Sequence, residues 1–215
     1  MKVIIAALLI SLLGGCSSSK IMHSWKSDAL ATGKYNKILV VGLNGDDNIA
    51  MRAKMEEHLV GDLKALGYQA ISSLQEYGPK ALATREEETV LNELKSSGVD
   101  AVITIVLLDK EKEKHYVPGE VYYSPYFIYQ RNFWGYYRTM YGRIYSKGYY
   151  TTSTRYFWES NLYDLKSKEL LYSVQTESFD PASLESMAHE YGKLIVKDIV
   201  KKQVLNSQEG MARDK

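Results

Sequence analysis

Cysteine is nearly absent from this sequence of 215 residues, in which Cys16 is the only one. A single thiol cannot form an intramolecular disulfide, so the fold must be stable without one. An excess of either charge is also missing, because 27 basic and 26 acidic residues give a formal net charge of +1. A neutral chain has no long-range field to attract nucleic acid, so we expect no nucleic-acid partner.

The N-terminal region lacks an apolar run long enough to cross a membrane. Val3 to Leu13 form a stretch of about 11 residues behind the basic Lys2, whereas a spanning helix needs ~20. A short apolar stretch behind a positive charge is typical of a secretion signal, and we predict a signal peptide over residues 1–15.

The residues that end this stretch indicate a lipid attachment site. Leu13-Gly14-Gly15-Cys16 resembles the bacterial lipobox, in which a leucine and two small residues precede a cysteine. The resemblance implies that Cys16 is acylated, with diacylglyceryl and palmitate, and becomes the first residue of the mature lipoprotein. Because Ser17 rather than an aspartate follows, it also implies sorting to the outer membrane, on the periplasmic side.

The rest of the chain divides by composition. Residues 16–36 are rich in serine, lysine and threonine with little periodicity, and we predict a tether there. Residues 37–205 are expected to form a single domain, long enough to bury a core of its own, with an aromatic insertion at 118–154. The tail at 206–215 is polar and is expected to fray.

Residues 37–108 follow the order strand, helix, strand, helix, strand, which is typical of an α/β fold. Apolar, β-branched runs at 37–43, 68–74 and 99–108 predict the strands. The first helix is predicted from apolar residues at helical spacing, with Asp46 or Asp47 as its N-cap and Gly67 as its stop. Those apolar residues are Met51, Met55, Leu59, Leu63 and Leu66.

The second helix is predicted from the capping-box sequence Thr84-Arg85-Glu86-Glu87 and is expected to end at Gly98. Alternating charges at 110–114 then predict a solvated strand extension, and residues 155–165 and 170–179 predict an antiparallel hairpin. A last helix is expected near Asp180-Pro181. Its apolar stripe contains Leu184, Met187, Ala188, Tyr191, Leu194, Ile195 and Ile199.

The predicted fold class is therefore α/β, with a mixed β-sheet built from a β-α-β-α-β start and an antiparallel hairpin, followed by a C-terminal helix and interrupted by a tyrosine-rich insertion. We expect its core to combine both halves of the chain. Leu63, Val102, Ile103 and Leu194 should meet between the sheet and the helices.

This series of elements resembles a known group of bacterial envelope lipoproteins. The strands KILVVGL and DAVITIVLL carry the resemblance, with Leu162-Tyr163-Asp164-Leu165 and the strand that follows it. The domain is similar to the amino-terminal domain of TolB, in a group that includes the curli secretion lipoprotein CsgG and the penicillin-binding-protein activator LpoB. The resemblance covers 37–108 and 156–205 and implies a fold, from which no function follows.

Groups that carry out catalysis are also scarce. The helix with His189 has Lys193 where a zinc-protease helix needs its second histidine, and the other histidines, His23, His58 and His115, are scattered. Gly42-Leu43-Asn44-Gly45 lacks the third glycine and the lysine of phosphate loops. We predict no enzyme, no cofactor and no metal, and a hydrolase using Asp46, Asp47 or Glu159 has no supporting constellation. A cation site at Asp46, Asp47 and Asn48 is the alternative to their capping role.

Tyrosine is the residue that the insertion has in excess. Between residues 122 and 150, 13 of 29 residues are aromatic, ten of these are tyrosine, four residues are basic and none is acidic. Adjacent tyrosines point to opposite faces of an extended chain, so some rings must be exposed. The rings either pack a β-ribbon onto the domain with wet hydroxyl groups or form a recognition face.

We favour the recognition face, in a non-catalytic outer-membrane lipoprotein that binds an envelope partner. With Arg155, the stretch between Val121 and Trp158 has five basic residues and no acidic one, so its local charge is about +5, which favours an acidic protein, peptidoglycan or lipopolysaccharide. The alternative is an oligomeric structural or export component similar to the curli lipoprotein, with aromatic rings at the membrane interface. The expected contact residues are Tyr129, Trp134, Tyr136, Tyr137, Arg138 and Arg143.

Lipid attachment at Cys16 is directly testable because no other thiol is present. Cys16→Ser removes the nucleophile that would be acylated, so the variant should incorporate no palmitate and leave the membrane fraction. Labelling with palmitate and membrane fractionation measure this. Unchanged labelling and fractionation of the variant would contradict the predicted anchor.

Overall fold

The computed structural model describes residues 18–28, 35–45, 48–80, 85–117 and 149–206. Contacts divide the chain into two compact units, where the sequence predicts one domain over 37–205. The first unit contains residues 1–110 and 155–215, and the second contains residues 111–154. The strands that flank the insertion, at 101–117 and 149–164, each continue into the second unit. The second unit therefore begins at residue 111, before the predicted start of the insertion at 118.

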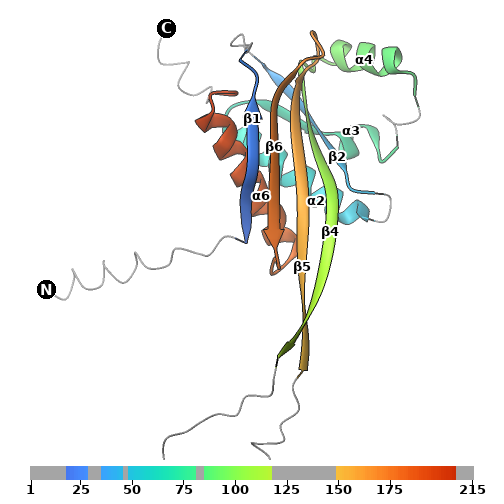
Figure 1. The fold of residues 1–215 in the computed structure, drawn as a ribbon. Helices are drawn as coiled ribbons and strands as arrows, with labels where there is room; N and C mark the ends of the chain where they lie inside the picture. The colour runs from blue at the N-terminus through green and yellow to red at the C-terminus, as the bar shows by residue number, and fades with distance from the viewer. Residues whose placement is uncertain (1–17, 29–34, 46–47, 81–84, 118–148, 207–215) are drawn as a thin grey trace, which may run out of the picture. The chain divides into compact units, whose positions relative to one another are not determined.

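A mixed six-stranded sheet with the order β1-β6-β5-β4-β2-β3 forms the framework and confirms the predicted α/β class (Figure 1). β2 pairs in parallel with β3 and β4, whereas β6 pairs antiparallel with β1 and β5. The strands are β1 (Ser19–Lys26), β2 (Lys37–Leu43), β3 (Gln69–Ser72), β4 (Ala101–Val117), β5 (Tyr149–Asp164) and β6 (Leu170–Phe179).

Helices cover both faces of the parallel part of this sheet. Because side chains alternate along a strand, Ile38 and Val40 of β2 join the main core, whereas Leu39 and Val41 join a smaller cluster with Leu94. The main core lies under α2 (Ile49–Ala65) and α6 (Leu184–Lys201), and the smaller cluster lies under α4 (Glu87–Ser96). A short helix, α3 (Ser73–Tyr77), follows β3.

The core differs from the single cluster predicted for four residues. Leu63 and Ile103 are fully buried in the main core. Val102 is only partly buried and packs in the smaller cluster on the other face, and Leu194 is partly exposed on α6. The prediction was wrong for Val102 because neighbouring residues of a strand point to opposite faces of the sheet.

The predicted tether at 16–36 is also wrong for residues 19–26, which form β1 at one edge of the sheet. β1 pairs with β6 from Ser19, opposite Ser178, to Lys26, opposite Tyr172. Its serine-rich and lysine-rich composition concealed it, because an edge strand needs only a few buried residues.

Several helix boundaries differ from the prediction. The N-cap of α2 is Asn48 rather than Asp46 or Asp47, and both of these aspartates lie outside the described residues. The N-cap of α4 is Glu86, which makes no side-chain capping hydrogen bond. The strand predicted at 68–74 is β3, and it ends at Ser72 because the Ser72 side chain caps α3. Ser183 caps α6 in a capping box with Ser186, two residues after the expected proline.

Other boundaries agree with the prediction. The hairpin of β5 and β6 is present, and Gly67 and Gly98 follow α2 and α4 with positive φ angles of 95° and 80°, which a glycine adopts without strain. The charged residues at 110–114 continue β4, as predicted for a strand extension.

The two faces of the sheet should respond unequally to truncation. Ile103→Ala removes a fully buried side chain from the main core, so the free energy of unfolding should fall by ~2–5 kcal/mol. Val102→Ala, its neighbour on the partly covered face, should cost less than half as much. Urea unfolding of both variants measures this, and equal losses would contradict the assignment of faces.

Candidate functional site

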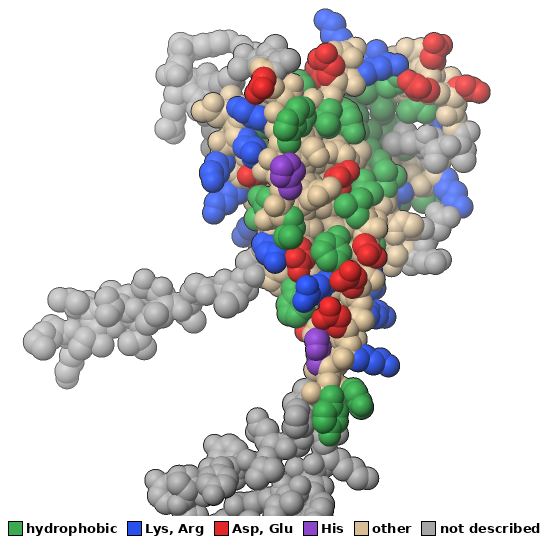
Figure 2. All heavy atoms as spheres, in the orientation of Figure 1, with side chains coloured by type: hydrophobic (Ala, Val, Ile, Leu, Met, Phe, Trp, Pro, Cys, Tyr) green, Lys and Arg blue, Asp and Glu red, His purple; other side chains and the backbone are tan. Residues whose placement is uncertain are grey.

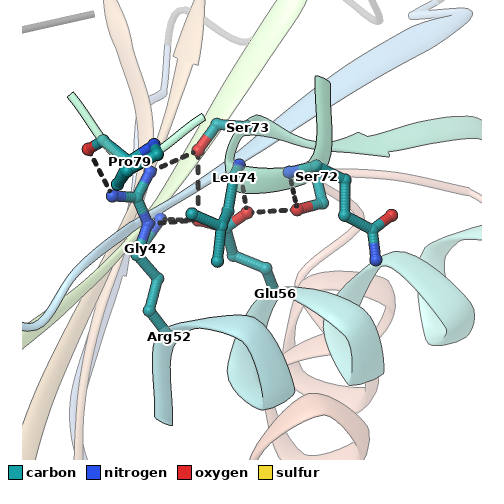
Figure 3. Close-up of polar contacts among 8 residues, drawn as sticks. Gly42, Arg52, Glu56, Ser72, Ser73, Leu74 and Pro79 are labelled. Atoms are coloured by element: carbon teal, nitrogen blue, oxygen red, sulfur yellow. Dashed lines mark hydrogen bonds and ion pairs between the residues drawn. The ribbon is translucent and has the colours of Figure 1, made fainter. Parts of the chain in front are cut away.

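Ligand sites of α/β proteins commonly lie at the carboxyl ends of parallel strands, which here are the ends of β2 and β3. Glu56 of α2 lies at this place and is fully buried (Figure 3). Its carboxylate accepts hydrogen bonds from the amides of Gly42 and Leu74 at 2.7 and 2.9 Å. The hydroxyl groups of Ser72 and Ser73 donate to it at 2.5 and 3.0 Å.

Arg52, one turn earlier on α2, completes this network. Its Nε donates to Glu56 at 2.9 Å, Nη2 donates to Ser73 Oγ at 3.0 Å and Nη1 donates to the carbonyl of Pro79 at 2.9 Å. A side chain at Gly42 would meet Arg52 Cγ at 2.7 Å, so the close approach requires glycine. The carboxylate is thus saturated with donors, and we assign the network a structural role rather than a catalytic one.

Removing this carboxylate should be costly. Glu56→Ala leaves five donors and the Arg52 charge without their acceptor, so unfolding should become easier by ~3–5 kcal/mol. Glu57→Ala is the matched control, because Glu57 is exposed and only contacts Lys54 at 3.0 Å. Chemical denaturation of both variants measures the difference. A Glu56→Ala variant as stable as Glu57→Ala would show that the network contributes nothing.

The cation site weighed as the alternative to capping at Asp46, Asp47 and Asn48 receives no support from the residues that are described. Asp46 and Asp47 lie outside them, and the Asn48 side chain donates a hydrogen bond to the Asn44 carbonyl at 3.2 Å. The Asn44 side chain is buried, and its amide has no hydrogen-bond partner among the described residues.

Two of the four histidines meet where α2 and α6 pack, which their separation in the sequence did not indicate. The rings of His58 and His189 lie edge to face at 5.5 Å, and His58 Nε2 is 2.7 Å from Glu185. Hydrogen bonds from His58 and Lys54 lower the pKa of Glu185, whereas burial raises the pKa of the nearby Asp62. Among the described ranges, no group of three or more histidine, cysteine or acidic residues is placed to hold a metal ion.

Outside this contact, charged and hydrophobic side chains are interspersed on the face of the molecule shown in Figure 2. Glu159 of β5, the residue weighed for a hydrolase, accepts hydrogen bonds from Asn161 at 3.0 Å and Gln175 at 2.9 Å. The carboxylate of Glu177 lies 3.0 Å from Lys20. These contacts pair Glu159 with two amides and Glu177 with an opposite charge.

The second unit exposes aromatic side chains. Its described residues, 111–117 of β4 and 149–154 of β5, include Tyr116, Tyr149 and Tyr150, which are 56%, 63% and 72% exposed. The rings of Tyr116 and Tyr150 lie 5.2 Å apart at 56°. Because adjacent residues of a strand point to opposite faces, the exposure of both Tyr149 and Tyr150 means that the described residues cover neither face of the strand at this point.

The residues predicted to carry function lie outside the described part of the chain. These are Cys16, Tyr129, Trp134, Tyr136, Tyr137, Arg138 and Arg143. The structure adds Tyr116 to the aromatic group, which the sequence analysis missed because the charged residues at 110–114 separated it from the apolar part of β4. We define the aromatic ribbon as residues 111–117 and 149–154.

No helix in the described ranges is both long and apolar enough to span a membrane. No protein-family model matches the chain, and no curated protein matches it.

Solved structures with similarity include a dodecamer of PelC from Paraburkholderia phytofirmans, at 14% identity and a TM-score of 0.44, covering 84% of this chain and 94% of that one. A lipoprotein from Neisseria meningitidis is 15% identical with a TM-score of 0.43, covering 77% and 99%. Because these TM-scores are below 0.5, the similarities carry no argument about this chain, and membership of the TolB-related group remains a prediction.

Proposed function

We propose that this protein is a non-catalytic lipoprotein of the outer membrane that faces the periplasm and binds an envelope partner through its tyrosine-rich basic segment. The lipid on Cys16 would hold it at the membrane. The partner would be an acidic protein surface, peptidoglycan or lipopolysaccharide, and no nucleic acid or cofactor is part of the proposal.

The exposure of Tyr116, Tyr149 and Tyr150 is the observation that carries this proposal. Rings that pack a ribbon onto a domain bury most of their area, which is about 150–250 Å² for each aromatic side chain. Three exposed rings within one ribbon are instead typical of a contact surface, because tyrosine gives large area at small entropic cost.

Charge favours an anionic partner. The chain as a whole is close to neutral, but no acidic residue lies between Val121 and Trp158, where Arg131, Arg138 and Arg143 are among the basic residues. Guanidinium groups beside aromatic rings can form paired hydrogen bonds with carboxylates or phosphates. The phosphates of lipopolysaccharide and the carboxylates of peptidoglycan peptides are both anionic acceptors of this kind.

The polar groups of the first unit support a role without catalysis. Glu56, the fully buried carboxylate at the strand ends, is saturated by hydrogen bonds, and Glu159 is bound by two amides. A general acid or base must have a free site for the proton that it transfers, and the five hydrogen bonds to Glu56 leave that carboxylate none.

Binding should depend on the exposed rings. Tyr149→Ser combined with Tyr150→Ser removes two rings but no charge, so sedimentation with purified sacculi or outer-membrane vesicles should fall at least tenfold. The melting temperature should change little, because neither ring is buried. Trp134→Ala with Arg138→Ala tests the insertion at two of its expected contact residues, where tryptophan offers the largest apolar contact and arginine can bind an anion.

Thr151→Ala with Thr152→Ala is the matched control, since both threonines are exposed in the same strand. If the tyrosine variant unfolds, the rings are structural, and if it binds as well as the threonine variant does, they do not contact the partner. Either result contradicts the proposal. The size of the detergent-extracted protein addresses the oligomeric alternative, for which a large ring is expected instead of a monomer or dimer.

A further inference from the structure

The start of β1 is fixed to two other elements only a few residues after Cys16. Ser18 donates hydrogen bonds from its amide and its hydroxyl group to Glu190 of α6, at 2.8 and 3.0 Å. Its carbonyl accepts a hydrogen bond from the amide of Phe179, the last residue of β6, at 2.8 Å. The hydroxyl group of Ser19 is buried against that of Ser178 at 2.8 Å. The ordered sheet therefore begins at Ser18 without a preceding spacer.

We propose that the corner of the sheet formed by the start of β1 and the end of β6, which β5 passes on its way from Tyr149, lies directly against the phospholipid headgroups of the membrane that anchors the protein. The inference rests on the proposed function, in that Cys16 carries the lipid. Only Ser17 separates Cys16 from Ser18, so their Cα atoms are at most about 7 Å apart. The headgroup layer on one side of a bilayer is ~5–8 Å thick, so an anchor of this length cannot hold the sheet clear of it.

The side chains at this end suit such a surface. Phe179 is 43% exposed, and the Arg155 guanidinium lies 5.2 Å from the centre of its ring. The Lys20 side chain is 64% exposed and extends to Glu177, which Arg155 also approaches. An aromatic ring beside two cations matches the boundary where acyl chains meet phosphate groups. The start of β1 and the end of β6 lie side by side in Figure 1.

The register of the strands places the three side chains together. Ser19 is opposite Ser178, and Ser178 is opposite Tyr156 on the next strand, so the row spans two strand spacings, ~10 Å. Lys20 and Arg155 each lie one residue from this row, and Phe179 is paired with Arg155. Both cations and the ring are thus within reach of the same few headgroups.

The test uses the full-length lipidated protein with one added cysteine. Acylation consumes the only native thiol, so Ala182→Cys or Ser167→Cys provides a unique site for a fluorophore. Ala182 is exposed shortly after the end of β6, whereas Ser167 is exposed in the turn at the opposite end of β5 and β6, roughly 30 Å away along the strands.

Each protein is reconstituted into vesicles of phosphatidylethanolamine and phosphatidylglycerol that contain a lipid with a nitroxide on its headgroup. We expect quenching at position 182 to exceed quenching at position 167 several-fold. Equal quenching at the two positions would overturn the proposal, because it would mean that the domain has no fixed end at the membrane.

A second comparison tests the short connection itself. A Gly-Ser insert of about 20 residues between Ser17 and Ser18 gives a mean reach of ~25 Å, so quenching at position 182 should fall to the level at position 167. Quenching that persists with the insert would overturn the claim that the short connection holds this end against the headgroups.

Flotation of the vesicles separates this inference from the proposed function. Protein that floats with the vesicles but shows equal quenching contradicts only the inference, and leaves both the anchor and the aromatic contact intact. Loss of flotation with lipidated protein would contradict the anchor and therefore both proposals. Binding to sacculi by the Tyr149 and Tyr150 variants is scored independently of either result.

Discussion

A buried negative charge is stable only when its surroundings replace the water that it has lost, and Glu56 imposes this constraint on the first unit. Its five donors come from β2, from the first turn of α2, from the last residue of β3 and from the first two residues of α3. Each donor is useful only in one position, so the network fixes α2 on the sheet and fixes the end of β3. The close approach at Gly42 follows from the same requirement.

This constraint explains which parts of the fold sequence patterns could predict. β2 and the apolar part of β4 are continuous β-branched runs because both faces of these strands are covered, and the stripe on α2 follows its one buried face. Nothing in such a pattern indicates that Glu56, within that stripe, is buried, because a glutamate between apolar positions is usually solvated. Only the distant donors on β3 and α3 make its burial possible, and pairing across that separation is not encoded locally.

The missed strand and the missed caps have a similar cause. β1 satisfies the edge of β6 mainly through backbone hydrogen bonds, so its side chains carry little periodicity and its composition is typical of a linker. The N-cap positions moved by one or two residues because several polar residues near each helix start are chemically able to cap, and packing of the helix decides among them. For the candidate site, the sequence could predict the aromatic composition. It could not predict that the rings of Tyr116 and Tyr150 contact each other, because these residues lie on different strands.

The two units therefore use polar and aromatic groups in opposite ways. In the first unit, Trp158, Tyr172 and Tyr191 are fully buried, and burial together with the Asp198 carboxylate raises the pKa of Tyr172, so that its hydroxyl group remains a donor to that carboxylate at 2.8 Å. In the second unit Tyr116, Tyr149 and Tyr150 of the aromatic ribbon are exposed, and the rings of Tyr116 and Tyr150 contact each other. Tyrosine has the same apolar ring and polar hydroxyl group in both places. A buried ring stabilises the fold of its own chain, whereas an exposed ring can still gain contact area from a partner. The aromatic ribbon, rather than the core, therefore has the rings that can contribute to binding.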